Sequence, residues 1–258
     1  MRRIILWLAY DGTAYCGFQT QPNGVAVAAV LDAALTKLAG HPVRVLGASR
    51  TDSGVHARAQ AASFDLDSAI PTAAIPAALR GLLPDDVVVY AAAEVAADFA
   101  IIREAAGKHY RYSVRCGGFA DPFDRRYVYH VDYVPQLAPM CEAARLLEGE
   151  HDFRAFTAAH SGRENFVRRL DRITVTTEGD LLYFDFWGRG FLYKMVRGLT
   201  GFLLDCGRGR FAPPHGSAVL QSGERSALGL CAPAHGLCLE RVYFEENEYL
   251  AALPKSVL

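Results

Sequence analysis

Apolar and polar positions in the first third of the chain follow strand and helix periods in turn. Residues 4–10 form an apolar, β-rich run that ends at the turn signal Asp11-Gly12. Residues 27–38 then place apolar side chains at helical spacing, and Gly40 closes this pattern. The other elements predicted for this region are strands at 43–46 and 60–66, a helix at 75–83 and a strand at 87–95. The order βαββαβ is the ferredoxin-like pattern.

A similar but less regular pattern follows Gly107. Its predicted elements are strands at 109–114 and 126–131, a helix at 137–147, strands around Thr174 and Leu182, helices at 191–204 and 214–221, and a strand at 237–244. We therefore predict an α+β fold of two ferredoxin-like (βαββαβ) halves, with antiparallel sheets joined side by side, helices on one face and a central cleft. The predicted domains are residues 1–103 and 104–258, because the segment 96–107 is the best candidate boundary.

Composition restricts the class of protein. With 51% hydrophobic and 21% charged residues in 258 positions, the chain is expected to fold into a soluble globular protein and not to be disordered. No apolar run reaches the roughly 18 residues needed to span a bilayer, so no membrane association is predicted. The six cysteines lack CxxC spacing, which favours free thiols in a reducing cytoplasm. Cys231, His235 and Cys238 have no second ligand pair nearby, so we predict no metal site.

Charge gives a local signal only. The formal net charge is −1, which does not by itself indicate a nucleic-acid-binding protein. Residues 153–215, however, hold ten basic and six acidic side chains, a local excess of +4. Most of these cations are arginines, which suit phosphate contacts, although a codon bias produces the same preference for arginine over lysine.

The most informative segment for chemistry is residues 47–57, which read GASRTDSGVHA. Arg50 and Asp52 are two positions apart, so in an extended strand their side chains would share one face and could form an ion pair. The turn-forming run Asp52-Ser53-Gly54 would bend the chain just after that pair. An arginine neighbour keeps a carboxylate ionised, as a nucleophile or a base requires. Taken alone, the segment fits a surface turn with one weak ion pair better than it fits a catalytic site.

This segment resembles the GRTDxGVHA motif of the tRNA pseudouridine synthase A family, and other matches follow the family's order. Residues 10–23 read YDGTAYCGFQTQPN and are similar to its opening YDGTxYxGFQxQPN. The remaining similar segments are 108–112 (KHYRY), 151–156 (HDFRAF), 190–197 (GFLYKMVR) and 232–237 (APAHGL). The resemblance runs from about residue 10 to about residue 240.

The resemblance implies an enzyme that isomerises uridine to pseudouridine at positions 38, 39 and 40 of the tRNA anticodon stem-loop. It also implies a cytoplasmic homodimer with a central RNA-binding cleft. Because the reaction involves no redox change, no cofactor is expected. Asp52 would be the catalytic carboxylate, and Arg50 would displace the flipped base or hold its gap. Tyr110 would stack on the uracil and assist a late proton removal, and Arg197 would pair with Asp52 and keep it charged.

The substrate-binding residues are predicted from the same resemblance and from local charge. Leu237 would line the uracil pocket. The candidate RNA contacts are Arg163, Arg168, Arg169 and Lys194. Structural alternatives remain open for each: a core position for Tyr110 and Leu237, and a solvated charged face for Arg197 and the arginine cluster.

One segment departs from the family pattern. Phe99-Ala100-Ile101-Ile102 stands where the family has FHAR, and Arg103 follows one place later. A polar contact is therefore expected to be missing or shifted. This departure supports an alternative hypothesis, an RNA-binding or RNA-folding module that has lost catalysis. A related synthase with a different RNA target is a third possibility.

Overall fold

The computed structural model describes residues 1–22, 24–157 and 164–254. These residues form two compact units. The first contains Met1–Ala106 and Cys238–Phe244, and the second contains Gly107–Leu237 and Glu245–Leu258. The predicted α+β class is confirmed, because both units combine helices with a β-sheet. The C-terminal strand belongs to the first unit, although the sequence pattern assigned it to the second half.

The first unit follows the predicted order of strands and helices. Its main elements are β1 (Arg2–Tyr10), α1 (Val27–Ala39), β2 (Leu46–Gly47), β3 (His56–Leu66), α2 (Ile75–Leu79), β4 (Val87–Val95) and β10 (Leu237–Tyr243). Strand β1 lies between β4 and β3 and is antiparallel to both. The other edge of β3 is shared: β2 pairs antiparallel with its Ala62 and Ser63, and β10 pairs parallel with its His56 and Ala57.

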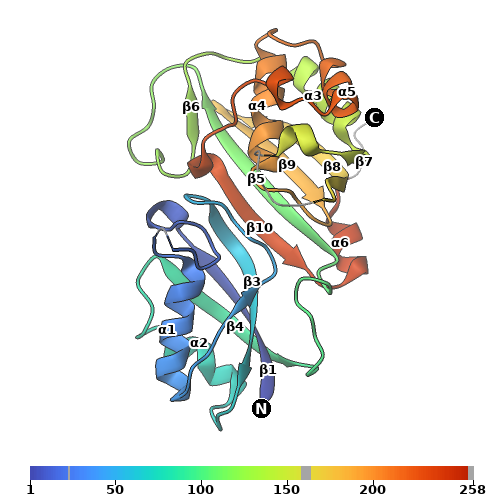
Figure 1. Ribbon diagram of the computed structural model, residues 1–258. Coiled ribbons are helices and arrows are strands. Elements are labelled where there is room, and N and C mark those ends of the chain that lie inside the picture. The colour runs from blue at the N-terminus through green and yellow to red at the C-terminus, as the bar shows by residue number, and fades with distance from the viewer. Residues whose placement is uncertain (23, 158–163, 255–258) are drawn as a thin grey trace. The chain divides into compact units, whose positions relative to one another are not determined.

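Alternation in β1 explains how this sheet buries one face. Ile4, Leu6 and Leu8 are fully buried and point to the same side, because every second residue of a strand shares a face. Leu31 and Leu35, one helical turn apart on α1, are also buried. Figure 1 shows α1 and α2 on one face of this sheet. The unit is therefore a two-layer arrangement of helices on a sheet.

The second unit is built on a longer antiparallel sheet. Its elements are β5 (Gly107–Cys116), β6 (Tyr129–Val131), α3 (Leu137–Leu147), β7 (Gly149–Asp152), β8 (Val167–Glu178), β9 (Leu181–Gly188), α4 (Met195–Gly207), α5 (His215–Ser222) and α6 (Glu246–Ala252). Strands β5, β9, β8 and β7 are neighbours in that order, and β6 pairs parallel with the end of β5. Helices α3 and α4 pack against each other, and α3 also packs on β8.

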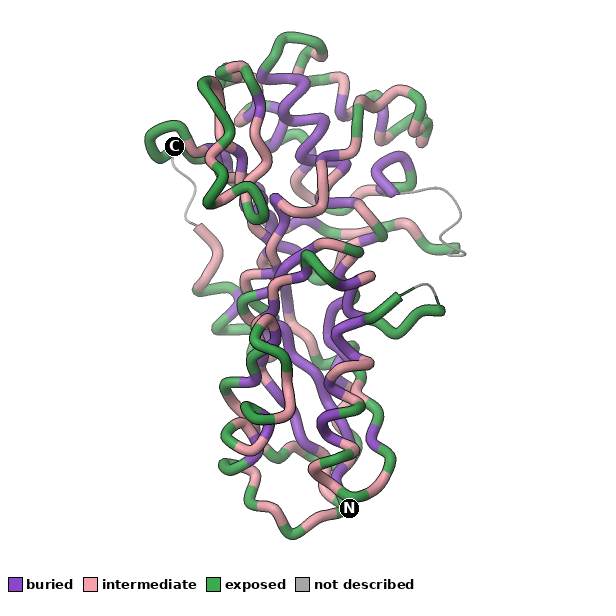
Figure 2. Tube along the Cα trace, turned by 90° about the vertical axis from the view of Figure 1, so that its left-hand side faces the viewer, coloured by how far each residue is buried: buried purple, intermediate pink, exposed green. Residues whose placement is uncertain are grey.

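Aromatic rings fill the core of the second unit. Phe153, Phe156 and Phe202 are fully buried, and Phe156 packs edge to face on the other two, with ring centroids 5.9 Å apart for Phe153 and 6.1 Å for Phe202. In both units the buried residues follow the strands and core helices, while exposed residues collect in the loops (Figure 2). Among the described residues, no helix combines the length and apolar character needed to cross a membrane. All six cysteines are free thiols.

Several element boundaries differ from those predicted. Helix α4 begins at Met195 and not at residue 191, because Lys194 adopts a left-handed backbone with φ of 59°, which a helix cannot include. Strand β3 begins at His56 and not at residue 60, and β2 is only two residues long. Helix α2 ends at Leu79, before Gly81 and Pro84. Strand β7 and helix α6 were not predicted.

Candidate active site

Arg50 and Asp52 lie in the loop of residues 48–55 that joins β2 to β3, called the Asp52 loop below. Arg50 is exposed and Asp52 is half-buried. The expected ion pair between the two is absent, since Arg50 has no hydrogen bond or ion pair within the described part of the chain. The expectation assumed an extended strand, in which residues two apart share a face, whereas this segment is a loop that turns at Asp52. The Val55 N–H closes that turn on the Asp52 carbonyl at 3.1 Å.

The start of the Asp52 loop is held by a buried amide. Gln60 on β3 is fully buried, and its side-chain amide forms two hydrogen bonds with the backbone of Ser49. The Ser49 N–H donates to Gln60 Oε1 at 3.2 Å, and Gln60 Nε2 donates to the Ser49 carbonyl at 2.7 Å. Because buried polar groups need partners, this reciprocal pair fixes the backbone just before Arg50.

The centre of the loop is held by residues 10–18, a segment that begins at Tyr10, the last residue of β1. The hydroxyls of Tyr10 and Thr51 form a buried hydrogen bond of 2.7 Å. The Phe18 N–H donates to the Thr51 carbonyl at 3.2 Å. Gly17 allows this close approach: its φ is +106°, and a Cβ there would lie 2.6 Å from the Thr51 oxygen. The backbone on the amino side of Asp52 is therefore fixed by contacts from a distant part of the sequence.

Tyr15 holds the other side of Asp52. Its carbonyl accepts hydrogen bonds from the Ser53 hydroxyl and the Gly54 N–H, each at 3.2 Å. Its own hydroxyl donates to Asp86 Oδ1 at 2.5 Å. Burial, together with this carboxylate, raises the pKa of Tyr15, so the phenol stays protonated and remains a donor. Tyr15 therefore links the turn at Asp52 to the residue just before β4.

The end of the loop meets residues 11 and 12. The Gly12 N–H donates to His56 Nδ1 at 3.0 Å, and Asp11 Oδ1 lies 3.1 Å from the same nitrogen. A Cβ at Gly12 would overlap the Val55 carbonyl oxygen, so no larger residue fits. His56 therefore contacts both residues of the turn that follows β1.

These contacts give a structural reason why the motif at residues 10–23 and the motif at residues 47–57 occur in the same chain. The segment 10–18 matches the family's opening motif, and its role in the structure is to fix the Asp52 loop. Sequence reasoning did not assign Tyr10, Tyr15, Gln60 or Asp86 to the site. Tyr10 and Tyr15 could have been found from the motif at residues 10–23, and Gln60 because it is a polar residue in a largely apolar strand. No feature of the sequence marks Asp86.

Three motif segments of the second unit contact one another. Tyr110, on β5, is buried and packs edge to face on Phe191, with ring centroids 5.1 Å apart. Arg197, on the first turn of α4, is half-buried, and its Nε donates to the Ala232 carbonyl at 2.8 Å. The structure thus joins segments 108–112, 190–197 and 232–237.

The segment before Leu237 is fixed by a second tyrosine. The Tyr112 hydroxyl donates to the Pro233 carbonyl at 2.7 Å. Gly236 packs against the Tyr112 ring, where a Cβ would lie 2.6 Å from a ring carbon. Leu237 itself is buried at the start of β10. The second unit therefore positions the predicted residues Tyr110, Arg197 and Leu237 through one set of contacts.

The predicted RNA-contact residues are less clearly grouped. Arg163 lies outside the described residues. Arg168 is half-buried and donates to the carbonyls of Val167 and Asn165. Arg169 is exposed and forms an ion pair of 2.7 Å with Asp171. Lys194 is half-buried, with its ammonium 5.1 Å from the centroid of the Tyr193 ring. The local positive charge predicted for this stretch is therefore partly neutralised by neighbouring acids.

Residues 99–103, which depart from the family pattern, pack against the rest of the first unit. Ile101 is buried, and the Phe99 carbonyl accepts a hydrogen bond of 3.0 Å from Arg3. Arg103 is exposed and pairs with Glu104 at 3.1 Å. The basic residue one place later therefore binds a neighbouring carboxylate at the surface.

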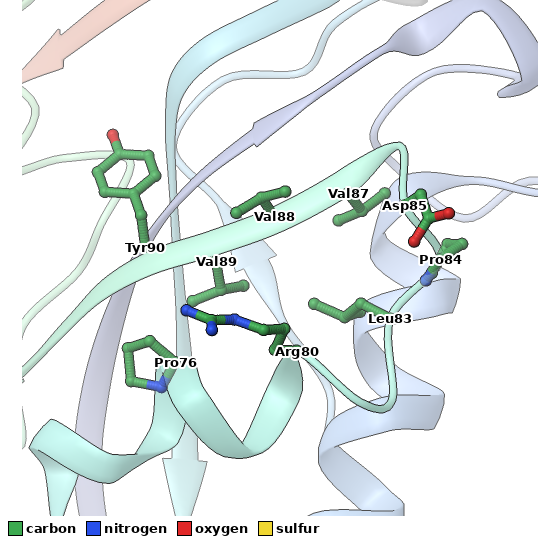
Figure 3. Close-up of a pocket in the computed structure, with 9 residues that line it drawn as sticks. All are labelled: Pro76, Arg80, Leu83, Pro84, Asp85, Val87, Val88, Val89 and Tyr90. Carbon is green, nitrogen blue, oxygen red and sulfur yellow. The ribbon is translucent and has the colours of Figure 1, made fainter.

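A hollow of about 280 Å³ lies between α2 and β4 (Figure 3). None of the predicted site residues lines it, and its polar groups are Arg80, Asp85 and Tyr90. Within residues 1–22, 24–157 and 164–254, no cluster of three His, Cys, Asp or Glu side chains is placed to hold a metal ion.

Comparison with known proteins identifies close relatives. The chain matches the family model described as tRNA pseudouridine synthase over residues 7–102 and 143–245. The tRNA pseudouridine synthase A of Pelobacter propionicus is 42% identical over 244 residues, which cover 95% of this chain and 100% of that protein. The protein of the same name from Geobacter sulfurreducens shows the same identity and coverage. That from Exiguobacterium sibiricum is 40% identical over 248 residues, 96% of this chain and 99% of its own length.

Proposed function

Because this chain belongs to the tRNA pseudouridine synthase A family, we propose that it acts on the anticodon stem-loop of tRNA, at positions 38, 39 and 40. It is an isomerase that converts uridine in tRNA to pseudouridine. The observation that carries this function is the similarity to synthases over 95% of the chain, with the Asp52 loop inside the matched region.

We propose Asp52 as the catalytic carboxylate. The reaction breaks the N-glycosidic bond, turns the freed uracil and joins its C5 carbon to the same sugar. C5 then loses its proton, and the released N1 takes one up. A carboxylate can attack the sugar, attack the base or remove a sugar proton, and each role needs a charged group at a fixed position. The half-buried position of Asp52, with its backbone held on both sides, supports this role.

Arg50 is proposed to occupy the space that the flipped uridine leaves. Unstacking a base costs roughly a few kcal/mol, which contacts with the protein must offset. Arg50 is exposed and has no partner among the residues that the structure describes, yet it lies between the buried residues Ser49 and Thr51, whose backbone is fixed. An exposed guanidinium on a rigid backbone suits insertion into a base stack.

Tyr110 and Arg197 are proposed as further catalytic residues. Both match the family's motifs, and the contacts of Tyr110 with Phe191 and of Arg197 with Ala232 give each a defined orientation. Leu237 is proposed to contact the uracil. The proposed RNA contacts are Arg163, Arg168, Arg169 and Lys194.

The finer features of the fold remain proposals as well. In the first unit the antiparallel order β4, β1, β3 and β2 supports a ferredoxin-like half. In the second, the succession β5, α3, β8, β9 and α4 supports a related half. The division at residue 103 rests on the sequence pattern around residues 96–107. A central RNA-binding cleft, a cytoplasmic homodimer and the absence of a cofactor are carried from the family.

Mapping the product tests the proposed function. Purified protein is incubated in excess with unmodified tRNA that has uridine at positions 38, 39 and 40, and pseudouridine is located by carbodiimide labelling and primer extension. Modification at these positions, and none in a control tRNA with cytidine there, is expected. Modification elsewhere would contradict the proposed target, and no product at enzyme excess would support the binding-module alternative.

A further inference from the structure

Two phenylalanines stand almost fully in solvent on one loop of the second unit. Phe119 is 94% exposed and Phe123 is 93% exposed. They lie in residues 117–127, between β5 and β6, called the phenylalanine loop below and shown in green beside β6 in Figure 1. Grouped exposed rings mark interaction sites, because large apolar side chains are normally buried. No predicted site residue lies in this loop.

Both ends of the phenylalanine loop are fixed. The Gly117 N–H is shared between the carbonyls of Val131 and Tyr133, at 2.8 and 3.1 Å. At the other end, the Tyr127 and Val128 N–H groups donate to the Asp124 carbonyl at 2.7 and 3.1 Å. The loop therefore has a defined backbone.

The tip is also ordered by local hydrogen bonds. Asp121 Oδ1 accepts from the Phe123 N–H at 2.9 Å, which sets the turn before that ring. Arg115, on β5, binds Asp124 at 2.6 Å and also binds Asp180. The structure therefore holds the Phe123 backbone in place while its ring points into solvent.

Exposed arginines lie close to Phe123 in the sequence. Arg125 and Arg126 come two and three positions after Phe123, and both are exposed. Asp124, which stands between Phe123 and Arg125, is paired with Arg115. Exposed aromatic rings beside arginines are the combination that binds unpaired nucleotides, through stacking on the bases and ionic contact with phosphates.

We propose that the phenylalanine loop binds an unpaired stretch of the tRNA substrate, with Phe119 and Phe123 stacking on bases and Arg125 contacting a phosphate. The proposal rests on the proposed function, because it concerns recognition of the same substrate. RNA is favoured over a protein partner because exposed arginines, which can contact phosphates, lie close to the exposed rings.

Replacement of both rings tests the proposal. In Phe119→Ala/Phe123→Ala, we expect the Kd for unmodified tRNA to rise at least about tenfold, since stacking contributes a factor of about 5 to 150 per base. KM should rise in parallel, while the single-turnover rate at saturating tRNA stays unchanged. Leu230→Ala is the matched control, an 85% exposed apolar residue in the same unit, and it should leave Kd unchanged.

Conservative variants separate stacking from apolar docking. Phe119→Trp/Phe123→Trp should bind tRNA like the wild type, whereas Phe119→Leu/Phe123→Leu should bind as weakly as the alanine variant. Arg125→Ala should reduce the slope of log K against log salt by about 1, as expected for one lost phosphate contact.

Three results would overturn the inference: wild-type affinity in the alanine variant, full affinity in the leucine variant, or a changed oligomeric state of the alanine variant in sedimentation. The last two would indicate a protein partner. These outcomes are distinct from failure of the proposed function, in which the wild-type protein itself makes no pseudouridine.

Discussion

The Asp52 loop and the phenylalanine loop each connect two strands, but they are stabilised in different ways. The Asp52 loop forms hydrogen bonds with Gln60 on β3, with Tyr10 at the end of β1 and with Tyr15 in the segment after β1. Its backbone is tied to residues far away in the sequence. The phenylalanine loop is held mainly by its own residues and the strands it joins, and its rings stay in solvent.

The difference in stabilisation fits the two functions proposed for these loops, catalysis and base stacking. Chemistry requires a reacting group within about half an ångström of its position, which only a densely bonded surrounding can maintain. Stacking on an unpaired base tolerates more variation, since every base has an aromatic face. Damage to the supports of the Asp52 loop should therefore lower the rate, and damage to the phenylalanine loop should lower affinity.

The largest effect is expected from Gly17→Ala. The positive φ alone costs about 1–3 kcal/mol for a residue with a side chain. The new Cβ would also press on the Thr51 carbonyl and move the backbone beside Asp52. A displacement of about 1 Å can lower a rate about a hundredfold. We expect a fall of that size in kcat, measured as pseudouridine formed at saturating tRNA.

Gly118→Ala in the phenylalanine loop is the matched control. Gly118 also has a positive φ, of 57°, but a Cβ there meets no atom within 4 Å. Its free energy of unfolding should fall while kcat stays at the wild-type value. Equal losses of kcat in the two variants would show that backbone strain, and not contact with the Asp52 loop, is responsible.

A smaller effect is expected when the link between Tyr15 and Asp86 is broken. Tyr15→Phe and Asp86→Asn each weaken a hydrogen bond to a charged group, which contributes about 1.5–3 kcal/mol. Because Tyr15 holds Ser53 and Gly54 through its carbonyl, kcat should fall roughly tenfold, the equivalent of about 1.4 kcal/mol, with little change in KM. A double variant no worse than either single one would show that the two residues act through one bond.

The same link predicts a dependence of stability on pH. The pKa of Tyr15 is raised by burial and by Asp86, so the folded state retains the phenol proton more tightly than the unfolded state. Its contribution to stability is complete below about pH 10, the ordinary pKa of tyrosine, and is lost as pH rises towards the folded pKa. Above pH 10, denaturant titrations should show a shallower loss of stability in Tyr15→Phe than in the wild type. Equal slopes would contradict this account.

The smallest effect concerns the stability of the phenylalanine loop. Phe119→Ala and Phe123→Ala should change the free energy of unfolding by less than about 0.5 kcal/mol, because the rings are already in solvent. Urea titration measures this change. A loss of about 2 kcal/mol or more would mean that the rings are buried in solution, against the comparison drawn between the two loops.

Local patterns allowed much of the fold to be predicted. The helix at 137–147 and the strand at 87–95 were predicted with their observed bounds, since their apolar spacing is regular. The start of α4 could not be predicted, because the left-handed backbone at Lys194 is imposed by surrounding structure and carries no glycine signal. Helix α6 was missed because it is only seven residues long and Tyr249 is its one buried residue, so it has no apolar periodicity.

The sequence allowed the residues of the candidate site to be predicted, but not the contacts that hold them in place. Asp52 and Arg50 were found from motif and charge, but their expected ion pair depended on a strand that the structure replaces with a loop. The bonds from Gln60 and Asp86 join residues separated by up to 71 positions, a separation that no local pattern reports. The conformation of the Asp52 loop could not be predicted because it depends on these long-range contacts.

The most direct test of the central claim is the Asp52→Asn protein, assayed together with the wild type for tRNA affinity and for release of tritium from uracil C5. The account predicts that the variant folds, binds unmodified tRNA with wild-type Kd and releases no tritium, because only the carboxylate is changed. Tritium release from the variant at the wild-type rate would remove Asp52 from the reaction and contradict the account.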